Sequence, residues 1–214
     1  MKIFDEKTLI QLKEAFDNKL KNEVKILFFK SSETDKYIEE TEAFLNELKS
    51  TTDKIKLEIY ENEENNEKIE KFSIKLYPAI VLTNEDESIT GIKYYGIPAG
   101  HEINSFVLDL ISISGNEKAL SAQILDRINK INKKVNIKIF ISLSCPHCPG
   151  AVVNAHRLAL ENRNIDAEMI ESSRFNELAN KFGVSAVPHI LFNETEKLLG
   201  DQPLDKFLDI IENL

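Results

Sequence analysis

The same order of predicted secondary-structure elements occurs twice along the 214 residues of this chain, and this repeat limits the fold more than any other feature. A Lys-Phe pair ending at Phe72 precedes Pro78 by six residues, and a second pair ending at Phe182 precedes Pro188 by the same six. The second set lies 110 residues after the first. Two copies of one structural unit are therefore expected.

The boundary between the copies follows from a second offset. The first expected strands, around Ile26 and Ile139, are 113 residues apart. The difference of three residues falls in connections, where changes of length are tolerated. We therefore place the boundary near Ser114-Gly115 and expect two units, residues 1–115 and 116–214, of which the second holds both cysteines.

Hydrophobic spacing predicts the elements of each unit, because apolar residues at helical spacing indicate helices and apolar residues that alternate with charged ones indicate half-buried strands. In the first unit the expected helices lie near residues 8–20, 35–48, 69–72 and 103–111, and the expected strands near 24–29, 55–59, 79–82 and 93–95. In the second unit the expected helices lie near 120–131, after Cys145, and near 175–182 and 204–211, and the expected strands near 137–141, 167–169 and 189–192 with a turn at 193–196.

Each unit thus consists of strand, helix, strand, helix, hairpin and helix. A parallel pair of strands needs a crossover helix, and a hairpin adds antiparallel strands to the same sheet. The expected fold class is α/β, with two tandem thioredoxin-like units. Each would be a mixed β-sheet flanked by helices and preceded by one additional helix.

Charge argues against a nucleic-acid or membrane partner. The chain has 27 basic and 36 acidic residues, for a net charge of −9, and −8 of this belongs to residues 1–115. A chain this acidic repels phosphate backbones and anionic lipid. Solubility alone explains such a surface; the alternative is an adaptor, in which the acidic first unit docks a partner while the second unit does the chemistry.

The apolar runs are also too short to span a bilayer. The longest, such as residues 26–29, contain four residues, whereas a spanning helix needs about 20. The amino end, residues 1–7, lacks the apolar core of a secretory signal. We therefore expect a cytoplasmic protein.

The chemistry is concentrated in Cys145-Pro146-His147-Cys148, which follows an expected strand and opens an expected helix. In a cytosolic strand–helix–strand context this spacing indicates a redox pair. Side chains three apart on a helix lie about 5–6 Å apart, a separation that a disulfide can bridge. On this reasoning Pro146 occupies the first helical position, and Pro149 is expected to distort the helix locally.

Position on the helix predicts the role of each residue. Cys145, at the exposed amino end where the helix dipole favours a thiolate, is the expected nucleophile, and Cys148 is the expected resolving thiol. His147 is expected to stabilise the Cys145 thiolate and so to make the pair a stronger oxidant. The alternative for His147 is an exposed spacer.

Pro188 begins an expected strand, where a proline marks an edge, a bend or a cis bond. The matched Pro78 of the first unit favours the cis bond. That bond would bring the backbone of Val187 close to the dithiol. We therefore expect Val187 and Pro188 to contact the substrate.

These residues resemble the archaeal-type, glutaredoxin-like protein disulfide oxidoreductases. The resemblance covers essentially the whole chain and includes residues 95–102, 148–152 and 155–156. The lead-in at 142–145 also resembles the amino-terminal domain of the flavoprotein component of alkyl hydroperoxide reductase. The resemblance implies a cis Pro188 and thiol–disulfide exchange with protein disulfides, in cell redox homeostasis. The alternative that it implies is a relay of electrons from a flavin-dependent disulfide reductase to a peroxiredoxin.

One departure from the first family separates the two units. Its members usually carry a second Cys-x-x-Cys in the first unit, where the offset of 113 places Ser32 and Asp35 in this chain. The first unit is therefore expected to lack thiol exchange, as in the reductase domain. This argues against disulfide isomerisation that needs two communicating dithiols.

Glu102 opens an expected helix of the first unit. It is either a first-turn acid that complements the helix dipole, or a partly buried carboxylate that faces the dithiol and takes the proton of Cys148. The remaining histidines, His101, His156 and His189, are expected to be structural because other metal-type residues do not surround them.

A metal or iron–sulfur binding module is the competing class of function. A structural zinc needs four ligands, and an iron–sulfur cluster is held by several cysteines. The chain offers Cys145, Cys148 and scattered histidines. We therefore expect no metal and no cofactor.

Overall fold

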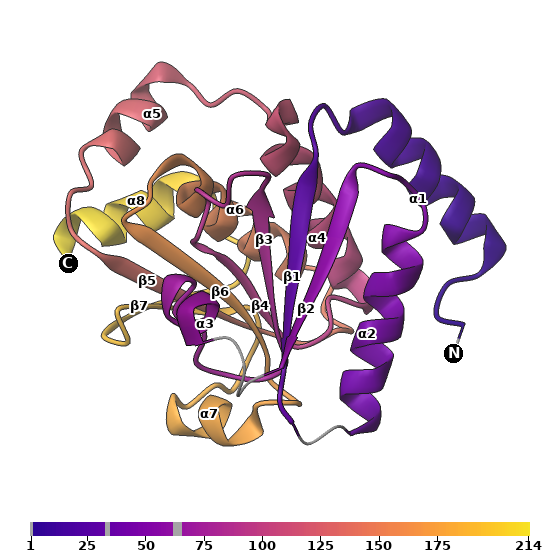
Figure 1. Cartoon of the computed structure of the whole chain (residues 1–214). Coiled ribbons are helices and arrows are strands. Elements are labelled where there is room, and N and C mark those ends of the chain that lie inside the picture. The colour runs from indigo at the N-terminus through magenta and orange to yellow at the C-terminus, as the bar shows by residue number, and fades with distance from the viewer. Residues whose placement is uncertain (1, 33–34, 62–65) are drawn as a thin grey trace. The chain divides into compact units, whose positions relative to one another are not determined.

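The structure of the chain is a computed structural model, and it describes residues 2–32, 35–61 and 66–214 (Figure 1). Contacts between residues divide the chain into two compact units. Unit 1 contains residues 1–90, 95–97 and 110–117, and unit 2 contains residues 91–94, 98–109 and 118–214. This division groups residues by contact, and the boundary near residue 115 between the two sequence copies stays a prediction.

Unit 1 is a mixed sheet with helices. Its elements are α1 (Glu6–Lys19), β1 (Val24–Lys30), α2 (Lys36–Lys49), β2 (Ile55–Glu61), α3 (Asn66–Lys71), β3 (Ala79–Asn84) and the π-helix η2 (Ser112–Asn116). Strand β1 is central, because it pairs in parallel with β2 and antiparallel with β3. Its residues Ile26, Leu27 and Phe28 are fully buried.

Aspartate side chains begin the two long helices of unit 1. Asp5 accepts a hydrogen bond from the main-chain N–H of Thr8 at 2.7 Å, and Asp35 accepts one from Ile38 at 2.9 Å. Each aspartate satisfies an N–H that the first turn leaves without a partner. Helix α1 then buries Leu12 and Phe16, as their spacing predicted.

Unit 2 has the larger set of elements. They are β4 (Ile92–Tyr95), the 3₁₀ helix η1 (Gly100–Glu102), α4 (Ile103–Ile111), α5 (Ala122–Asn129), β5 (Val135–Ile141), α6 (Cys148–Glu161), β6 (Ile165–Glu171), α7 (Asn176–Lys181), β7 (His189–Phe192), β8 (Glu196–Leu199) and α8 (Leu204–Asn213). Residues 92–94 of β4 and 103–109 of α4 belong to this unit. Its strands follow the order β4-β6-β5-β7-β8.

The strand pairing of unit 2 repeats that of unit 1. Strand β5 pairs in parallel with β6 and antiparallel with β7, as β1 does with β2 and β3. Helix α6 packs on β5 and β6, and α5 and α8 pack against α6 (Figure 1). The predicted thioredoxin-like class, a mixed sheet flanked by helices in each unit, is confirmed.

The leading helix of unit 2 is shorter than its apolar spacing predicted. It begins after Ser121, whose hydroxyl accepts from the N–H of Ile124, so Leu120 lies outside it. At the other end Ile131 follows the helix and is buried in the connection to β5. Apolar spacing therefore continued beyond the helix because the flanking chain also packs against the core.

None of the helices within residues 2–32, 35–61 and 66–214 is long and apolar enough to cross a membrane.

Candidate active site

The two cysteines form a disulfide between the end of β5 and the start of α6. Their Cα atoms are 5.5 Å apart, within the usual range for a disulfide. Cys148 is fully buried, whereas Cys145 is half-buried and Pro146 and His147 are exposed. A substrate can therefore reach the sulfur of Cys145 but not that of Cys148.

The expected position of the helix relative to the cysteines was wrong. Helix α6 begins at Cys148 with His147 as its N-cap, so Cys145 and Pro146 precede it. A turn holds Cys145, whose N–H donates to Ser142 at 2.9 Å and whose carbonyl accepts from Cys148 at 3.4 Å. Pro149 lies in the first turn of the helix, where a missing N–H has no helical partner to lose.

A cis peptide bond joins Val187 to Pro188 beside this turn, and the prediction of a cis Pro188 is confirmed. The Val187 carbonyl oxygen lies 3.8 Å from the Sγ of Cys145. Pro188 is buried, and Val187 is half-buried. The matched bond before Pro78 in unit 1 is also cis.

Glu102 is fully buried and lies in unit 2, not in the first unit as expected. It ends η1, which packs against α6. Its Oε2 accepts from the hydroxyl of Ser105 at 2.5 Å, and within the described residues Oε1 has no hydrogen-bonding partner. Burial raises the pKa of Glu102 to about 7, partly offset by the Ser105 hydrogen bond and the charge of His156. A group with this pKa can give or take a proton near neutral pH.

A main-chain contact fixes η1 on the turn that carries the disulfide. The N–H of His101 donates to the carbonyl of Leu143 at 3.1 Å. Gly100 has a φ of +59°, and a Cβ there would overlap the main-chain oxygen of Leu143. A residue with a side chain at position 100 would push η1, and with it Glu102, away from this turn.

A buried hydrogen-bonded chain lies behind the site and was not predicted from the sequence. The Oδ2 of Asp109 lies 2.5 Å from the Tyr94 hydroxyl, which donates to it, and 2.5 Å from the Nδ1 of His156. Tyr94 and His156 are fully buried, and their rings meet edge to face at 4.8 Å. Burial and the Asp109 charge raise the pKa of Tyr94. His156 is structural, as expected, but its aspartate partner is hidden in the sequence within an apolar helix.

The other candidate histidines do not join the disulfide in a common group. His101 is exposed. His189 is buried, and burial lowers its pKa. Among the residues that the structure describes, no three or more His, Cys, Asp or Glu side chains form a group able to hold a metal ion.

Asp201 also lies at the site, although no sequence pattern indicated that it would. Its carboxylate lies on Gly150 in the first turn of α6, so that a Cβ at Gly150 would stand 2.6 Å from Oδ1 and closer still to Oδ2. The preceding residue, Gly200, donates its N–H to the carbonyl of Pro188 at 2.9 Å. Asp201 therefore joins the two segments that flank the disulfide.

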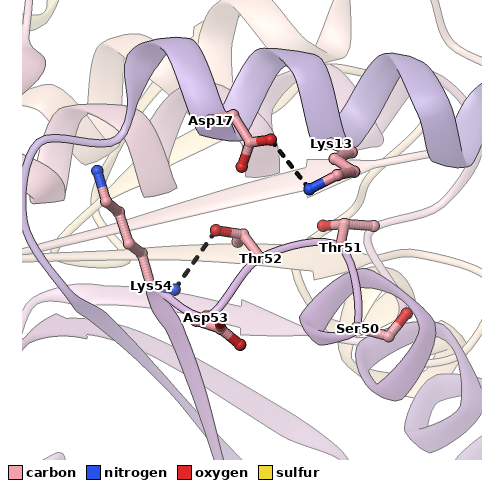
Figure 2. Close-up of a pocket in the computed structure, with 7 residues that line it drawn as sticks. All are labelled: Lys13, Asp17, Ser50, Thr51, Thr52, Asp53 and Lys54. Atoms are coloured by element: carbon pink, nitrogen blue, oxygen red, sulfur yellow. Dashed lines mark hydrogen bonds and ion pairs between the residues drawn. The ribbon is translucent and has the colours of Figure 1, made fainter.

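The counterpart of this site in unit 1 has a different construction. Asp35 caps α2, and residues 33–34 lie outside the described residues. Figure 2 shows a polar pocket of unit 1 between α1 and residues 50–54. There Lys13 pairs with Asp17 at 3.0 Å, and the N–H of Lys54 donates to the hydroxyl of Thr52 at 3.4 Å. The pocket therefore holds paired surface groups and no sulfur.

Comparison with known proteins gives the same fold. A family model described as "Thioredoxin domain" matches residues 135–212. The crystal structure of the NTD_N/C domain of alkylhydroperoxide reductase AhpF of Enterococcus faecalis (V583) is 32% identical. It covers 98% of this chain and all of that one, with a TM-score of 0.91. A protein disulfide oxidoreductase from Aeropyrum pernix K1 is 26% identical, with 98% and 94% covered and a TM-score of 0.89.

The curated relatives are longer than this chain. The AhpF-type alkyl hydroperoxide reductase of Staphylococcus aureus (strain NCTC 8325 / PS 47) is 34% identical over 124 residues, which are 58% of this chain and 24% of that protein. The chain spans about a quarter to a third of the length of the curated relatives that it matches.

Proposed function

Because the chain belongs to the thioredoxin-like family that includes the NTD_N/C domain of alkylhydroperoxide reductase AhpF, we propose that its Cys145–Cys148 dithiol reduces disulfides of other proteins. The observation that carries the proposal is the pairing of one accessible and one buried cysteine, with the Val187 carbonyl against the accessible one. This arrangement supplies an attacking sulfur and a protected resolving sulfur.

The exchange takes two steps. The Cys145 thiolate attacks one sulfur of the substrate disulfide, a new S–S bond joins Cys145 to the substrate, and the other substrate sulfur leaves as a thiolate. Cys148 then loses its proton and attacks the Sγ of Cys145. The Cys145–Cys148 bond forms again, the second substrate sulfur leaves, and two electrons have passed to the substrate.

Several neighbours of the dithiol take proposed roles in these steps. Glu102, on η1 against α6, takes the proton of Cys148; its burial and a pKa of about 7 support this role. Val187 and Pro188 line the approach to Cys145 and contact the substrate chain, supported by the 3.8 Å contact of the Val187 carbonyl. His147, exposed at the N-cap of α6, adds a charge-dependent influence on the Cys145 thiolate.

The proposed partners follow from the family. The dithiol of a flavin-dependent disulfide reductase restores the Cys145–Cys148 dithiol by the same exchange, and the electrons pass on to a peroxiredoxin. The 32% identity over the whole length of the Enterococcus faecalis domain favours this relay over general reduction of protein disulfides.

Trapping of the mixed disulfide tests the function. Cys148→Ser should accumulate a covalent adduct with an oxidised peroxiredoxin, because the resolving thiol is missing. Cys145→Ser should form none, since Cys148 is buried. Non-reducing electrophoresis and mass spectrometry detect the adduct. An adduct through Cys148, or none with either variant when the unmodified dithiol is oxidised, would refute the proposed order of attack.

A general substrate separates the two versions of the function. The reduced chain is mixed with insulin and, in parallel, with an oxidised peroxiredoxin, and loss of its thiols is followed in time. A relay predicts much faster oxidation by the peroxiredoxin. Equal rates would favour a general disulfide reductase.

A further inference from the structure

The loop between β8 and α8 brings a carboxylate to the helix that carries the resolving cysteine. Asp201 lies so close to Gly150 that a Cβ at this position would overlap its carboxylate. Gly150 is two residues after Cys148, in the first turn of α6. The carboxylate therefore lies at the end of α6 that is next to the disulfide.

Both ends of this loop are fixed, so the position of Asp201 is not that of a free surface side chain. On one side Gly200, with a φ of +77°, donates its N–H to the carbonyl of Pro188 at 2.9 Å. On the other side the carbonyl of Gln202 accepts from the side chain of Asn154 in α6 at 3.0 Å. The loop thus bridges Pro188 and the redox helix.

The amino end of a helix carries unpaired N–H groups and a partial positive charge, which stabilise a nearby anion. In the reduced protein the Cys145 thiolate draws on this charge. The carboxylate of Asp201 draws on the same charge and also repels the thiolate. Two anions at one helix end each weaken the stabilisation of the other.

We propose that Asp201 is a positioning residue that holds the dithiol on the reducing side, because its carboxylate competes with the Cys145 thiolate for the amino end of α6. The inference rests on the proposed function and adds to it the direction of electron flow. A less stable thiolate makes the reduced pair a better electron donor. Asp201 thus acts against the oxidising influence expected of His147.

Gly150 is the second half of this arrangement. Any larger residue at position 150 would occupy the space of the carboxylate, and the far end of the aspartate side chain is free to move away. Gly150→Ala should therefore displace the charge while leaving it in the protein. Alanine also suits a helix better than glycine.

The other ionisable groups that face this helix end are His147 in the same turn and Glu102 on η1. Both remain unchanged in the variants below. A change seen in the variants therefore comes from Asp201.

The test measures the thiolate fraction of Cys145 in the reduced chain, from its ultraviolet absorbance as a function of pH. It also measures the equilibrium constant of the dithiol with a reference thiol–disulfide couple. Asp201→Asn should raise the thiolate fraction below neutral pH, and should favour the reduced form, by roughly three- to tenfold. Gly150→Ala should move both quantities in the same direction, and the double variant should match Asp201→Asn alone. Glu196→Gln removes a charge from the opposite end of the β7–β8 pair and should change neither.

Unchanged thiolate fraction and equilibrium constant in Asp201→Asn would overturn the inference, and so would an equal shift in Glu196→Gln. The unfolding of each oxidised variant checks that it is folded, and if Gly150→Ala fails this check, Asp201→Asn decides alone. Failure of the proposed function looks different: the unmodified chain would show its thiolate and its equilibrium but would reduce no protein disulfide.

Discussion

Gly100 lies against the main-chain oxygen of Leu143, and this contact holds the short helix that ends in Glu102 on the turn that carries Cys145. The N–H of His101 bonds the same oxygen at 3.1 Å. A buried acid and a disulfide that are 43 residues apart in the chain, Glu102 and Cys145, are thereby joined by a rigid piece of backbone.

Gly100→Ala should lower the free energy of unfolding by about 1–3 kcal/mol, because a Cβ would overlap the Leu143 carbonyl and alanine is strained at a φ of +59°. Gly183→Ala is the matched control, since its φ is +65° and nothing lies within 4 Å of its Cβ position. Denaturant unfolding measures both. Equal losses in the two variants would mean that backbone strain, and not the contact with Leu143, is responsible.

Glu102 should make the oxidised protein less stable as the pH rises. Its pKa is raised from 4.5 to about 7 by burial, so the folded protein keeps a proton that the unfolded chain loses. This stabilisation is complete below pH 4.5 and is lost as the pH rises through 7, by about 3 kcal/mol in total. Glu102→Gln should remove most of this dependence in unfolding measured between pH 4 and 8.

Glu87 provides the opposite sign as a control. Hydrogen bonds from Lys68, Lys71 and Lys25 lower its pKa to about 2. Its contribution is therefore present above pH 4.5 and is lost as the pH falls towards 2, and Glu87→Gln should leave the slope between pH 5 and 8 unchanged. A wild-type slope in Glu102→Gln would contradict the assignment of the titration to Glu102.

Asp109→Leu should destabilise unit 2 strongly. It leaves the Tyr94 hydroxyl and the Nδ1 of His156, both buried, without the carboxylate that they now share. Each orphaned group costs about 1–3 kcal/mol, so a loss of roughly 2–5 kcal/mol is expected in urea unfolding. Asp126→Leu, at an exposed position of α5, should cost far less. Similar losses in both would show that the buried chain adds no stability.

Arg127 should contribute a small, salt-dependent stabilisation. Its guanidinium group joins α5 to α8 by ion pairs of 3.0 Å with Asp205, 2.9 Å with Asp209 and 2.7 Å with Glu212. Lysine cannot reproduce this forked geometry, and Arg127→Lys should cost at most about 1 kcal/mol because the network is largely exposed. The difference should shrink in high salt. A loss that is independent of salt would point to packing of the side-chain stem instead.

Local patterns were enough to predict most of the elements. The apolar spacing of α1 and α8, the alternation along β2 and the matched prolines of the two copies all depend on neighbours within a few residues. The redox pair and the cis bond before Pro188 were predictable for the same reason, since both follow from short motifs in a known order of elements.

The start of α6 could not be predicted in this way. Three consecutive positions, Cys145 to His147, suit a helix amino end equally well, and the choice was made by the turn in which the N–H of Cys145 bonds Ser142. Pro149 was expected to distort a helix that in fact begins at Cys148. Signals at helix ends depend on one or two hydrogen bonds, which neighbouring contacts easily shift.

The repeated order of strands and helices and the single dithiol in the second copy were already fixed by the order of residues, because periodicity and spacing are local properties. The surroundings of that dithiol were fixed by the packing of the folded chain. Glu102 joined unit 2, Asp109 met His156 across 47 residues, and Asp201 came to lie on Gly150. Each of these depends on a polar group that is positioned by the packing of separate elements, and no spacing along the chain records such a contact.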